Sequence, residues 1–374
     1  MAELFELTSI NGMELKNRFV RSGTWTGMAT EDGQMTPKLK DLIANVAKGG
    51  VGLVVPDFMP VAKDGICSDR QLGAYDDSQI SGLSEMVKEV HEAGSKVLAQ
   101  LVHGGAHSRI DLSGLEAAGP SAIPKTEGAF GEFPGCREMN QYDIDAVIEA
   151  YRQASIRCKQ AGFDGVQIHC AHGYLFSQFL SPFYNKRTDQ YGGSATNRAR
   201  IVVDTYNQVR QEVGQDYPIL VKLNMTDFFD GGITNDDALQ TAAILSDIGI
   251  DAIETSGGSA GWGFMVLGDM NKSPMRTEKE EGYYRDIARQ MKANWSTPII
   301  LTGGIRSYQT ADQYLQENIA DYIGLCRPLI NEPSLINRWE SGDTAESGCI
   351  SCNGCGMAVS MSGKDLACVQ QQKE

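Results

Sequence analysis

The sequence repeats one arrangement of polar and apolar positions along most of its length. An amphipathic stretch is followed by a glycine or small polar break and then by a short apolar run rich in β-branched residues. Such runs are typical of parallel strands, which are buried on both faces. A glycine after the amphipathic stretch supplies the left-handed residue with which many helices end. The eight runs are residues 18–22, 51–55, 96–102, 164–169, 219–223, 251–255, 299–302 and 321–325.

These alternating units predict an α/β fold, a closed (β/α)8 TIM barrel with a short cysteine-rich C-terminal tail. An open doubly wound sheet is the alternative, but the G-x-G-x-x-G fingerprint expected after its first strand is absent. Long connections follow predicted strands at residues 103–140, 170–197 and 257–276, on the barrel face that usually carries the chemistry. We expect one domain over residues 1–340 and a tail over residues 341–374.

Composition and charge disfavour several classes of protein. The 374-residue chain has 41% hydrophobic and 22% charged residues, and no apolar run approaches the roughly 20 residues of a membrane-spanning helix. A formal net charge of -15 disfavours binding to nucleic acid or to anionic membranes. The N-terminus lacks the pattern of a signal peptide, so we expect a cytoplasmic protein. We also expect a small-molecule substrate and a homo-oligomeric assembly.

Histidines gather beyond the predicted strands. Of the five in the sequence, His103 and His107 follow strand three, and His169 and His172 end strand four, with Tyr174 two residues further on. Two imidazoles that converge with a phenol can hydrogen-bond a carbonyl oxygen and deliver a proton beside it. They can also bind a metal ion, so this segment alone leaves both chemistries open.

The ends of the last two strands have the composition of a phosphate site. Strand seven ends in Gly303 and Gly304, and strand eight continues into Cys326 and Arg327. Glycines let backbone N–H groups approach a phosphate, and an arginine adds a bidentate charge. The loops after strands seven and eight form the recurrent phosphate site of TIM barrels, which favours this interpretation over simple turns.

Two polar side chains lie on strands that should be apolar, Gln100 on strand three and Lys222 on strand five. Because buried polar groups need partners, we expect both to face a ligand in the barrel mouth. For Lys222 the alternative is a side chain that extends to solvent.

A cysteine cluster occupies the last 26 residues. Its members follow the pattern Cys-x2-Cys-x2-Cys-x12-Cys and are Cys349, Cys352, Cys355 and Cys368. In a cytoplasmic chain such a cluster is more typical of metal binding than of disulfides. The spacing predicts a [4Fe–4S] cluster, with a zinc site or a remnant loop as alternatives. Asn353 and Gly354 tolerate left-handed backbone angles and would allow the turn between ligands.

These segments together resemble the old yellow enzyme family of flavin mononucleotide (FMN) oxidoreductases. The resemblance runs from Leu4 to the tail, and its most specific part is the string from His169 to Arg198. Two other segments also match the family, LKNRFV at residues 15–20 and QLVHGG at residues 100–105. The tail is similar to that of the branch containing trimethylamine dehydrogenase and dienoyl-CoA reductase.

The resemblance implies a role for each matching position. FMN would be bound at its ring by Ser22, Gly23, Thr24, Trp25, the backbone near Phe58, Gln100 and Lys222, and at its phosphate by Gly303, Gly304, Cys326 and Arg327. His169 and His172 would bind the substrate's carbonyl oxygen, and Tyr174 matches the proton donor. Two positions depart from the family, because Trp25 stands where Thr or Cys is common and Lys222 where Arg is usual.

The resulting hypothesis is an NAD(P)H-dependent ene-reductase, in which reduced FMN donates a hydride to an activated C=C bond. An amine or N-methyl dehydrogenase that passes electrons through FMN and an iron–sulfur cluster is a second hypothesis. A metal-dependent TIM-barrel hydrolase is a third. Because the sequence ends six residues after Cys368, we expect an external electron carrier or reductase subunit.

Overall fold

Parallel strands close into a barrel in the computed structural model, which describes residues 3–128, 131–259 and 280–371. Closure follows from strand β11, which pairs with β12 on one side and with β6 on the other. The predicted (β/α)8 barrel is therefore confirmed. Within the described residues the eight barrel strands are β3 (Phe19–Arg21), β4 (Leu53–Val54), β6 (Lys96–Val102), β11 (Gly165–Cys170), β12 (Ile219–Asn224), β13 (Ala252–Ser256), β14 (Ile299–Thr302) and β15 (Tyr322–Leu325).

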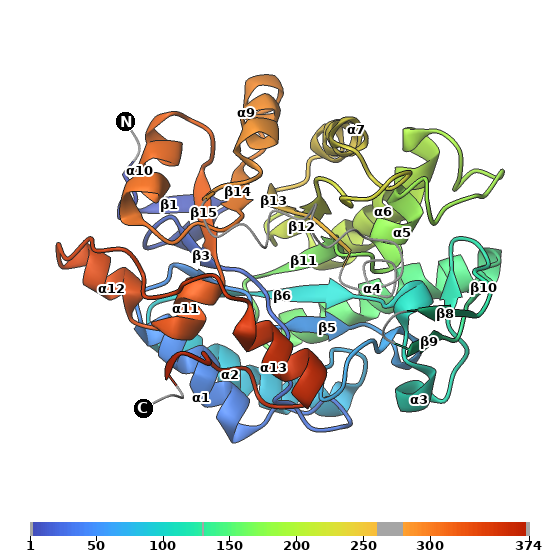
Figure 1. The fold of residues 1–374 in the computed structure, drawn as a ribbon, viewed down its shortest axis with the longest axis horizontal. Coiled ribbons are helices and arrows are strands. Elements are labelled where there is room, and N and C mark those ends of the chain that lie inside the picture. Colours follow the sequence, from blue (N-terminus) through green and yellow to red (C-terminus); the bar gives the residue numbers. More distant parts are fainter. Residues whose placement is uncertain (1–2, 129–130, 260–279, 372–374) are drawn as a thin grey trace.

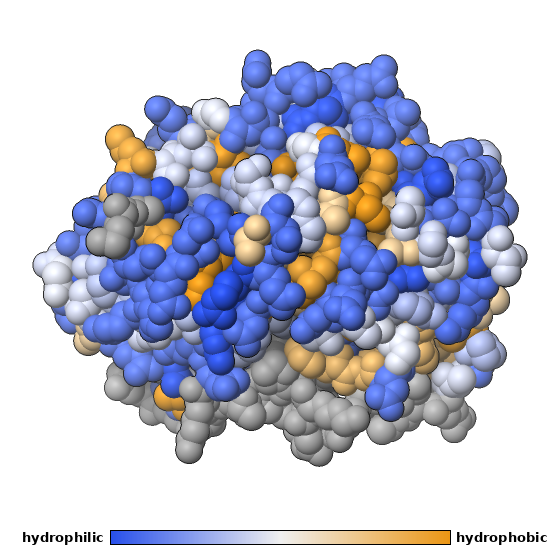
Figure 2. All heavy atoms as spheres, turned by 90° about the horizontal axis from the view of Figure 1, so that it is seen from above, coloured by the Kyte–Doolittle hydropathy of each residue, from blue (hydrophilic) through white to orange (hydrophobic). Residues whose placement is uncertain are grey.

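Helices connect successive strands and cover the outside of the barrel (Figure 1). They are α1 (Pro37–Lys48), α2 (Ile80–Glu92), α4 (Gln141–Gln160), α6 (Ala195–Val213), α7 (Asn235–Asp247), α9 (Arg285–Asn294), α10 (Tyr308–Gln316) and α11 (Arg327–Asn331). None of the helices in the described part of the chain is both long and apolar enough to cross a membrane. The face seen in Figure 2 is mostly hydrophilic, with small separate apolar areas.

Local sequence signals set the ends of these helices. At the start of α1 the Thr36 side chain accepts a hydrogen bond from the backbone N–H of Leu39. Asn140 and Asp143 form a reciprocal capping box at the start of α4, and α7 begins in the same way. As predicted, Gly94 follows α2 in the left-handed region, at φ 72°.

The second barrel strand differs from the predicted run 51–55. It is split into β4 and β5 (Phe58–Pro60), which pair with successive parts of β6. Pro56 lies between them and has no backbone N–H to donate to a neighbouring strand. The buried guanidinium of Arg21 instead binds the carbonyls of Val55 and Pro56. The break moves the end of this strand, with Phe58, toward the barrel mouth.

Apolar side chains fill the amino-terminal end of the barrel. A hairpin of β1 (Thr8–Ile10) and β2 (Met13–Leu15) packs there, and the Tyr322 hydroxyl donates a hydrogen bond to the Ser9 carbonyl at 2.9 Å. Hairpin and barrel strands share one buried cluster, made of Ile10, Met13, Leu15, Val20, Leu53, Val55, Leu98, Leu220, Ala252, Ile300 and Tyr322. Polar chemistry is thereby confined to the opposite, carboxyl end.

The remaining elements lie in the connections and the tail. They are β7 (Ala118–Gly119), β8 (Thr126–Gly128), β9 (Gly131–Phe133), β10 (Arg137–Glu138), α3 (Ile110–Ser113), α5 (Leu175–Leu180), α12 (Leu335–Glu340), α13 (Gly354–Ser362) and three single-turn 3₁₀ segments, η1 (Lys63–Gly65), η2 (Asp77–Gln79) and η3 (Gly105–His107). Of the predicted connection 257–276, residues 260–276 lie outside the described residues.

The tail folds back against the barrel, where α13 lies beside α11 in Figure 1. The Leu366 N–H donates to the Thr26 carbonyl at 2.9 Å, and Asp365 pairs with Arg70 at 2.8 Å. A Cβ on Gly27 would lie 3.0 Å from the Val359 side chain. The tail therefore covers the loop that follows the first barrel strand.

Three aspartates link neighbouring strands by hydrogen bonds at the amino-terminal end of the barrel. Asp164, Asp251 and Asp321 each precede one strand and accept the N–H of a residue at the start of the strand beside it, at 2.7–2.8 Å. Each also pairs with a basic side chain, and the Arg210–Asp251 pair is nearly buried. Each carboxylate thus ties a strand, its neighbour and a basic side chain together.

Asp251→Ala should lower the free energy of unfolding by about 3 kcal/mol, because it leaves the nearly buried charge of Arg210 without its carboxylate and the Ile219 N–H without its acceptor. The matched control is Asp286→Ala, which removes an exposed carboxylate on α9 and should cost less than about 0.5 kcal/mol. Denaturant unfolding measures both. Equal losses would contradict the role given to Asp251.

Candidate active site

The residues singled out from the sequence lie at the carboxyl ends of the barrel strands. Strand β6 carries Gln100, β11 carries His169 and β12 carries Lys222. The others follow strand ends or lie on β5, and they are Ser22, Gly23, Thr24, Trp25, Phe58, His172, Tyr174, Gly303, Gly304, Cys326 and Arg327. The barrel topology therefore gathers segments far apart in the sequence at one end.

A buried ion pair occupies the centre of this end. The Lys222 ammonium donates to Glu254 Oε1 at 2.7 Å and to Ser22 Oγ at 2.5 Å, and the Ser22 hydroxyl donates to the same carboxylate at 2.5 Å. Lys222 is 2% exposed, so its side chain does not extend to solvent. The positive charge of Lys222 holds the pKa of Glu254 below its usual value despite complete burial.

Amide side chains extend this polar layer across the barrel. Gln100 donates to Gln167 Oε1 at 2.6 Å, and Gln167 donates to Glu254 Oε2 at 2.8 Å. The Thr302 hydroxyl adds a third donor to Glu254 Oε1, at 2.9 Å. Sequence reasoning missed Glu254 and Gln167, although both show the signal that identified Lys222, a polar side chain on a buried strand.

The two histidines and Tyr174 converge above the polar layer. Ring centroids of His169 and His172 are 5.0 Å apart, and those of His169 and Tyr174 are 5.1 Å apart. Phe58 stacks on Tyr174 at 5.3 Å, with an interplanar angle of 26°. His172 has a left-handed backbone, at φ 64°, and its N–H donates to Asn224 Oδ1 at 3.2 Å. A sharp turn held by Asn224 thus brings both rings to one place.

Burial keeps both imidazoles neutral. It lowers the pKa of His172 to about 3 and that of His169 well below its usual value, and the charge of Lys222 acts in the same direction. His169 Nδ1 accepts the Ala171 N–H at 3.2 Å, so Nε2 carries the proton of the neutral ring. His172 Nε2 lies 2.6 Å from Ser256 Oγ. With Ser256 as donor, His172 carries its proton on Nδ1.

Tyr174 retains its proton for the same reason. Burial raises the pKa of its phenol well above the usual value, and nearby Asp57 adds to this shift. Asp57 is itself buried, and its pKa rises to about 7 by burial, although the Phe58 N–H and the Thr26 hydroxyl hydrogen-bond it. At neutral pH, His169, His172 and Tyr174 are therefore three uncharged hydrogen-bond donors.

Tyr283 links the two segments predicted to bind phosphate. A Cβ on Gly304 would lie 2.4 Å from the Tyr283 ring, and one on Gly303 would lie 3.0 Å from it. The Tyr283 hydroxyl accepts a hydrogen bond from Arg327 Nη2 at 3.0 Å, while Nη1 binds Asn353 Oδ1 at 2.6 Å. Arg327 thus connects the end of β15 to the tail as well as to the glycine pair, and Tyr283 gave no sequence signal.

The residues at the barrel mouth fit FMN. A Cβ on Gly23 would lie 3.0 Å from Gln100 Oε1, so the chain must approach closely there. Thr24 Oγ1 lies 2.8 Å from Cys326 Sγ, which joins the ends of the first and last strands. Trp25 donates its indole N–H to the Asp69 carbonyl at 3.0 Å. Amide, ammonium and hydroxyl donors beside glycine backbone suit a heterocycle edge and a phosphate.

The cysteines of the tail line one small cavity. Its walls are Arg327, Ile330, Cys349, Ile350, Cys352, Asn353, Cys355, Cys368, Val369 and Gln370. Among the described residues, no three His, Cys, Asp or Glu side chains stand close enough to hold a single metal ion. A four-iron cluster is larger than one ion and is reached by thiolates that stand further apart. The four thiols that line the cavity are of the ligand type that holds an iron–sulfur cluster.

One detail of the tail turn corrects the sequence prediction. Asn353 is left-handed, at φ 57°, as predicted, but the second such residue is Ser351 rather than Gly354. Gly354 begins α13, and a Cβ there would lie 2.5 Å from the Val369 side chain. Glycine is thus required at this position by packing and not by its backbone angle.

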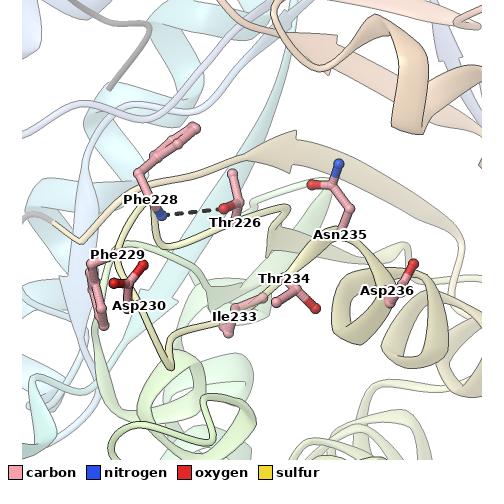
Figure 3. Close-up of a pocket in the computed structure, with 8 residues that line it drawn as sticks. All are labelled: Thr226, Phe228, Phe229, Asp230, Ile233, Thr234, Asn235 and Asp236. Atoms are coloured by element: carbon pink, nitrogen blue, oxygen red, sulfur yellow. Dashed lines mark hydrogen bonds between the residues drawn. The ribbon is translucent and has the colours of Figure 1, made fainter. Parts of the chain in front are cut away.

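A larger hollow, of about 500 Å³, opens at the rim beside the connection from β12 to α7 (Figure 3). Its lining residues are Thr226, Phe228, Phe229, Asp230, Ile233, Thr234, Asn235 and Asp236. It contains none of the residues predicted from the sequence. Asn224, which hydrogen-bonds the His172 N–H, lies two residues before the first lining residue. The hollow therefore lies next to the histidine pair and is not a separate candidate site.

The closed barrel and the donors at its mouth define a class, the flavin-dependent barrel oxidoreductases. The chain belongs to the NADH:flavin oxidoreductase / NADH oxidase family, whose model matches residues 3–346. The description of this family names NADH and a flavin as its reacting pair. Membership in a flavin family removes the support for a metal-dependent hydrolase.

Individual relatives agree with this assignment. The chain is 32% identical to an NADH oxidase from Thermoanaerobacter brockii, over 94% of this chain and 53% of that protein. It matches 2-naphthoyl-CoA reductase with a TM-score of 0.88 at 27% identity, over 98% of this chain and 56% of the other. An old yellow enzyme homologue from Zymomonas mobilis gives 0.77 at 25% identity, over 94% and 96%. The chain spans about half the length of the curated relatives that it matches.

Protonation of His172 should destabilise the fold in acid. The unfolded chain titrates this residue near pH 6.5, while the folded chain does so at about 3. Between these two pH values the unfolded chain binds a proton at His172 and the folded chain does not. The contribution of neutral His172 to the free energy of unfolding is therefore fully present above pH 6.5 and is lost as pH falls toward 3. His172→Gln should therefore remove roughly 3 kcal/mol of the stability loss measured between pH 7 and pH 4. If the free energy of unfolding falls by the same amount in the parent protein and in His172→Gln between pH 7 and pH 4, this role of His172 is contradicted.

Proposed function

We propose that the chain is the catalytic barrel of an NAD(P)H-dependent reductase of activated C=C bonds. One observation carries the proposal, the convergence of two neutral imidazoles and a protonated phenol. The ring centroid of His169 lies 5.0 Å from that of His172 and 5.1 Å from that of Tyr174. Uncharged donors fixed in a buried site stabilise an oxygen on which negative charge develops. A conjugated carbonyl is such an acceptor, because its oxygen gains charge as the alkene is reduced.

FMN, when bound, supplies the hydride chemistry, and the protein supplies orientation and electrostatics. Gln100 and Lys222 would hold the ring edge, and Gly303, Gly304 and Arg327 the phosphate. The Lys222–Glu254 pair fixes the ammonium in place by a 2.7 Å contact. Because Lys222 has a single charged head, it would present one positive point to the ring edge rather than the fork of an arginine.

The histidines and Tyr174 would divide the work on the substrate. His169 Nε2–H and His172 Nδ1–H would donate to the carbonyl oxygen and so fix its position. Ser256 and the Ala171 N–H would keep each ring in the tautomer that can donate. Tyr174, stacked on Phe58, would deliver its phenolic proton to the α-carbon.

The amine dehydrogenase hypothesis has less support from the same residues. An ammonium substrate favours a nearby free carboxylate, whereas Glu254 is already paired with Lys222. The positive charge of Lys222 also disfavours a second cation beside it. We therefore rank the reductase first.

The tail would carry electrons in either case. Cys349, Cys352, Cys355 and Cys368 would ligate one [4Fe–4S] cluster, in the cavity that they line together. Amide donors already point at two of the sulfurs, from Asn331 to Cys368 at 3.2 Å and from Gln370 to Cys352 at 3.8 Å. A cluster here would give single electrons a route to an external carrier or reductase subunit.

Replacing His169 and His172 with alanine should slow enone reduction by at least about 10³-fold, because both donors to the oxygen are lost. The double variant should still purify with FMN, since the phosphate and ring-edge residues are intact. The measurement is the reoxidation of the reduced flavin by 2-cyclohexenone without oxygen, with flavin content as the internal control. Reoxidation at the parent rate would show that these rings are not the donors.

Protein made and purified without oxygen should contain about four irons and four labile sulfides per FMN. The Cys352→Ser, Cys355→Ser double variant should lose them, because two of four ligands are gone. Cys67→Ser, which lies outside the tail, is the matched control and should retain the iron. Full flavin occupancy with no iron in the parent protein would contradict the cluster.

A further inference from the structure

A second group of polar side chains lies beside the histidine pair. His107 Nδ1 and Nε2, Tyr184 Oη and Ser259 Oγ are buried, and none has a hydrogen-bond partner of good geometry within the described residues, although the Tyr184 and Ser259 hydroxyls lie close to each other. The three residues are 7%, 4% and 1% exposed. Leaving such atoms unpaired is costly, so buried groups without partners in one place point to a ligand that pairs with them.

These atoms come from three different connections and meet at one point. A Cβ on Gly173 would lie 2.2 Å from Ser259 Oγ and 3.5 Å from His107 Nε2. The Tyr184 ring meets the His107 ring edge-on at 5.9 Å. Ser259 and His172 are bridge partners, which places the group directly beside the proposed carbonyl site.

The protein fixes this arrangement through Gln178. Its side-chain oxygen accepts the Ala106 N–H at 2.9 Å, and its amide donates to the Gly104 carbonyl at 3.0 Å and the Gly173 carbonyl at 2.6 Å. Gln178 therefore ties the connection that carries His107 to the one that carries His172. The positions of the unpaired atoms are thus set by a fully bonded neighbour.

The chemistry of the group favours an uncharged oxygen. Burial lowers the pKa of His107 to about 4, so the ring is neutral, and burial raises the pKa of the Tyr184 phenol. The carboxylate of Asp227, near Tyr184, would repel an anion. A neutral imidazole and two hydroxyls can all donate to a carbonyl or hydroxyl oxygen, and Phe133 adds an apolar wall at 6.1 Å from His107.

We infer that His107, Tyr184 and Ser259 form a second binding subsite, which takes a neutral carbonyl or hydroxyl oxygen of the substrate. The inference rests on the proposed function, because the first oxygen is the one held by His169 and His172. The substrate class is then a conjugated carbonyl compound with a second neutral oxygen at a separate position.

The test is equilibrium binding to the oxidised FMN holoenzyme, followed by the change in flavin absorbance. The probes are cyclohexanone, cyclohexane-1,4-dione and 4-oxocyclohexanecarboxylate. The parent protein should bind the dione about tenfold more tightly than cyclohexanone. It should bind 4-oxocyclohexanecarboxylate no more tightly than cyclohexanone. In Tyr184→Phe and Ser259→Ala this ratio should fall about threefold to tenfold, the effect of one neutral hydrogen bond.

Tyr217→Phe is the matched control, because its buried hydroxyl is also unpaired but precedes β12, at the opposite end of the barrel. It should leave the affinity ratio unchanged. Thermal unfolding of Tyr184→Phe adds a second readout, since loss of an unpaired hydroxyl should not lower the melting temperature.

Equal affinity of the parent protein for ketone and dione, or an unchanged ratio in both subsite variants, would overturn the inference. Failure of the proposed function has a different signature. In that case the reduced holoenzyme does not transfer electrons to 2-cyclohexenone, while the binding ratios can still follow the subsite.

Discussion

The ion pair between Lys222 and Glu254 constrains the whole carboxyl half of the barrel. Burial of either charge alone would be strongly destabilising, so each requires the other and a full set of hydrogen bonds. Thr302 on β14, Gln167 on β11 and Ser22, directly after β3, supply those bonds. The register of the barrel is thus fixed from inside as well as by its backbone, because a slipped strand would leave a buried charge unpaired.

The same pair sets the electrostatics of the site above it. Glu254 balances Lys222, so the centre of the mouth is polar without carrying net charge. Burial, together with the positive charge of nearby Lys222, keeps His169 and His172 neutral, as donors rather than as cations. A second consequence concerns the substrate, since neither the pair nor the neighbouring His107 group favours an anion.

The barrel could be predicted from the sequence because its signals are local. Apolar β-branched runs and helix-ending glycines identified every barrel strand, although Pro56 divided one of them. Gln100 and Lys222 were visible as polar residues where the pattern required apolar ones, and the histidines were visible by their position just beyond the strands. Glu254 shows the same signal but could be recognised only beside its partner.

Other features depend on contacts between distant segments and left no trace in the sequence. Tyr184 and Ser259 look like ordinary connection residues until folding places them against Gly173. Tyr283 reads as an ordinary aromatic residue before α9, and only the fold places it between Arg327 and the glycine pair. The sequence also could not show that Gly354 is needed for packing, because Val369 contacts it only in the folded tail.

The central claim is that the neutral donors above the Lys222–Glu254 layer direct electrons from FMN to a conjugated carbonyl. A stopped-flow experiment without oxygen tests it most directly, because it follows the flavin spectrum through both half-reactions. The account predicts that NADH or NADPH bleaches the flavin of the holoenzyme and that 2-cyclohexenone restores it, with one saturated ketone formed per flavin. A flavin that is bleached by methylamines and is not restored by the enone would contradict the account.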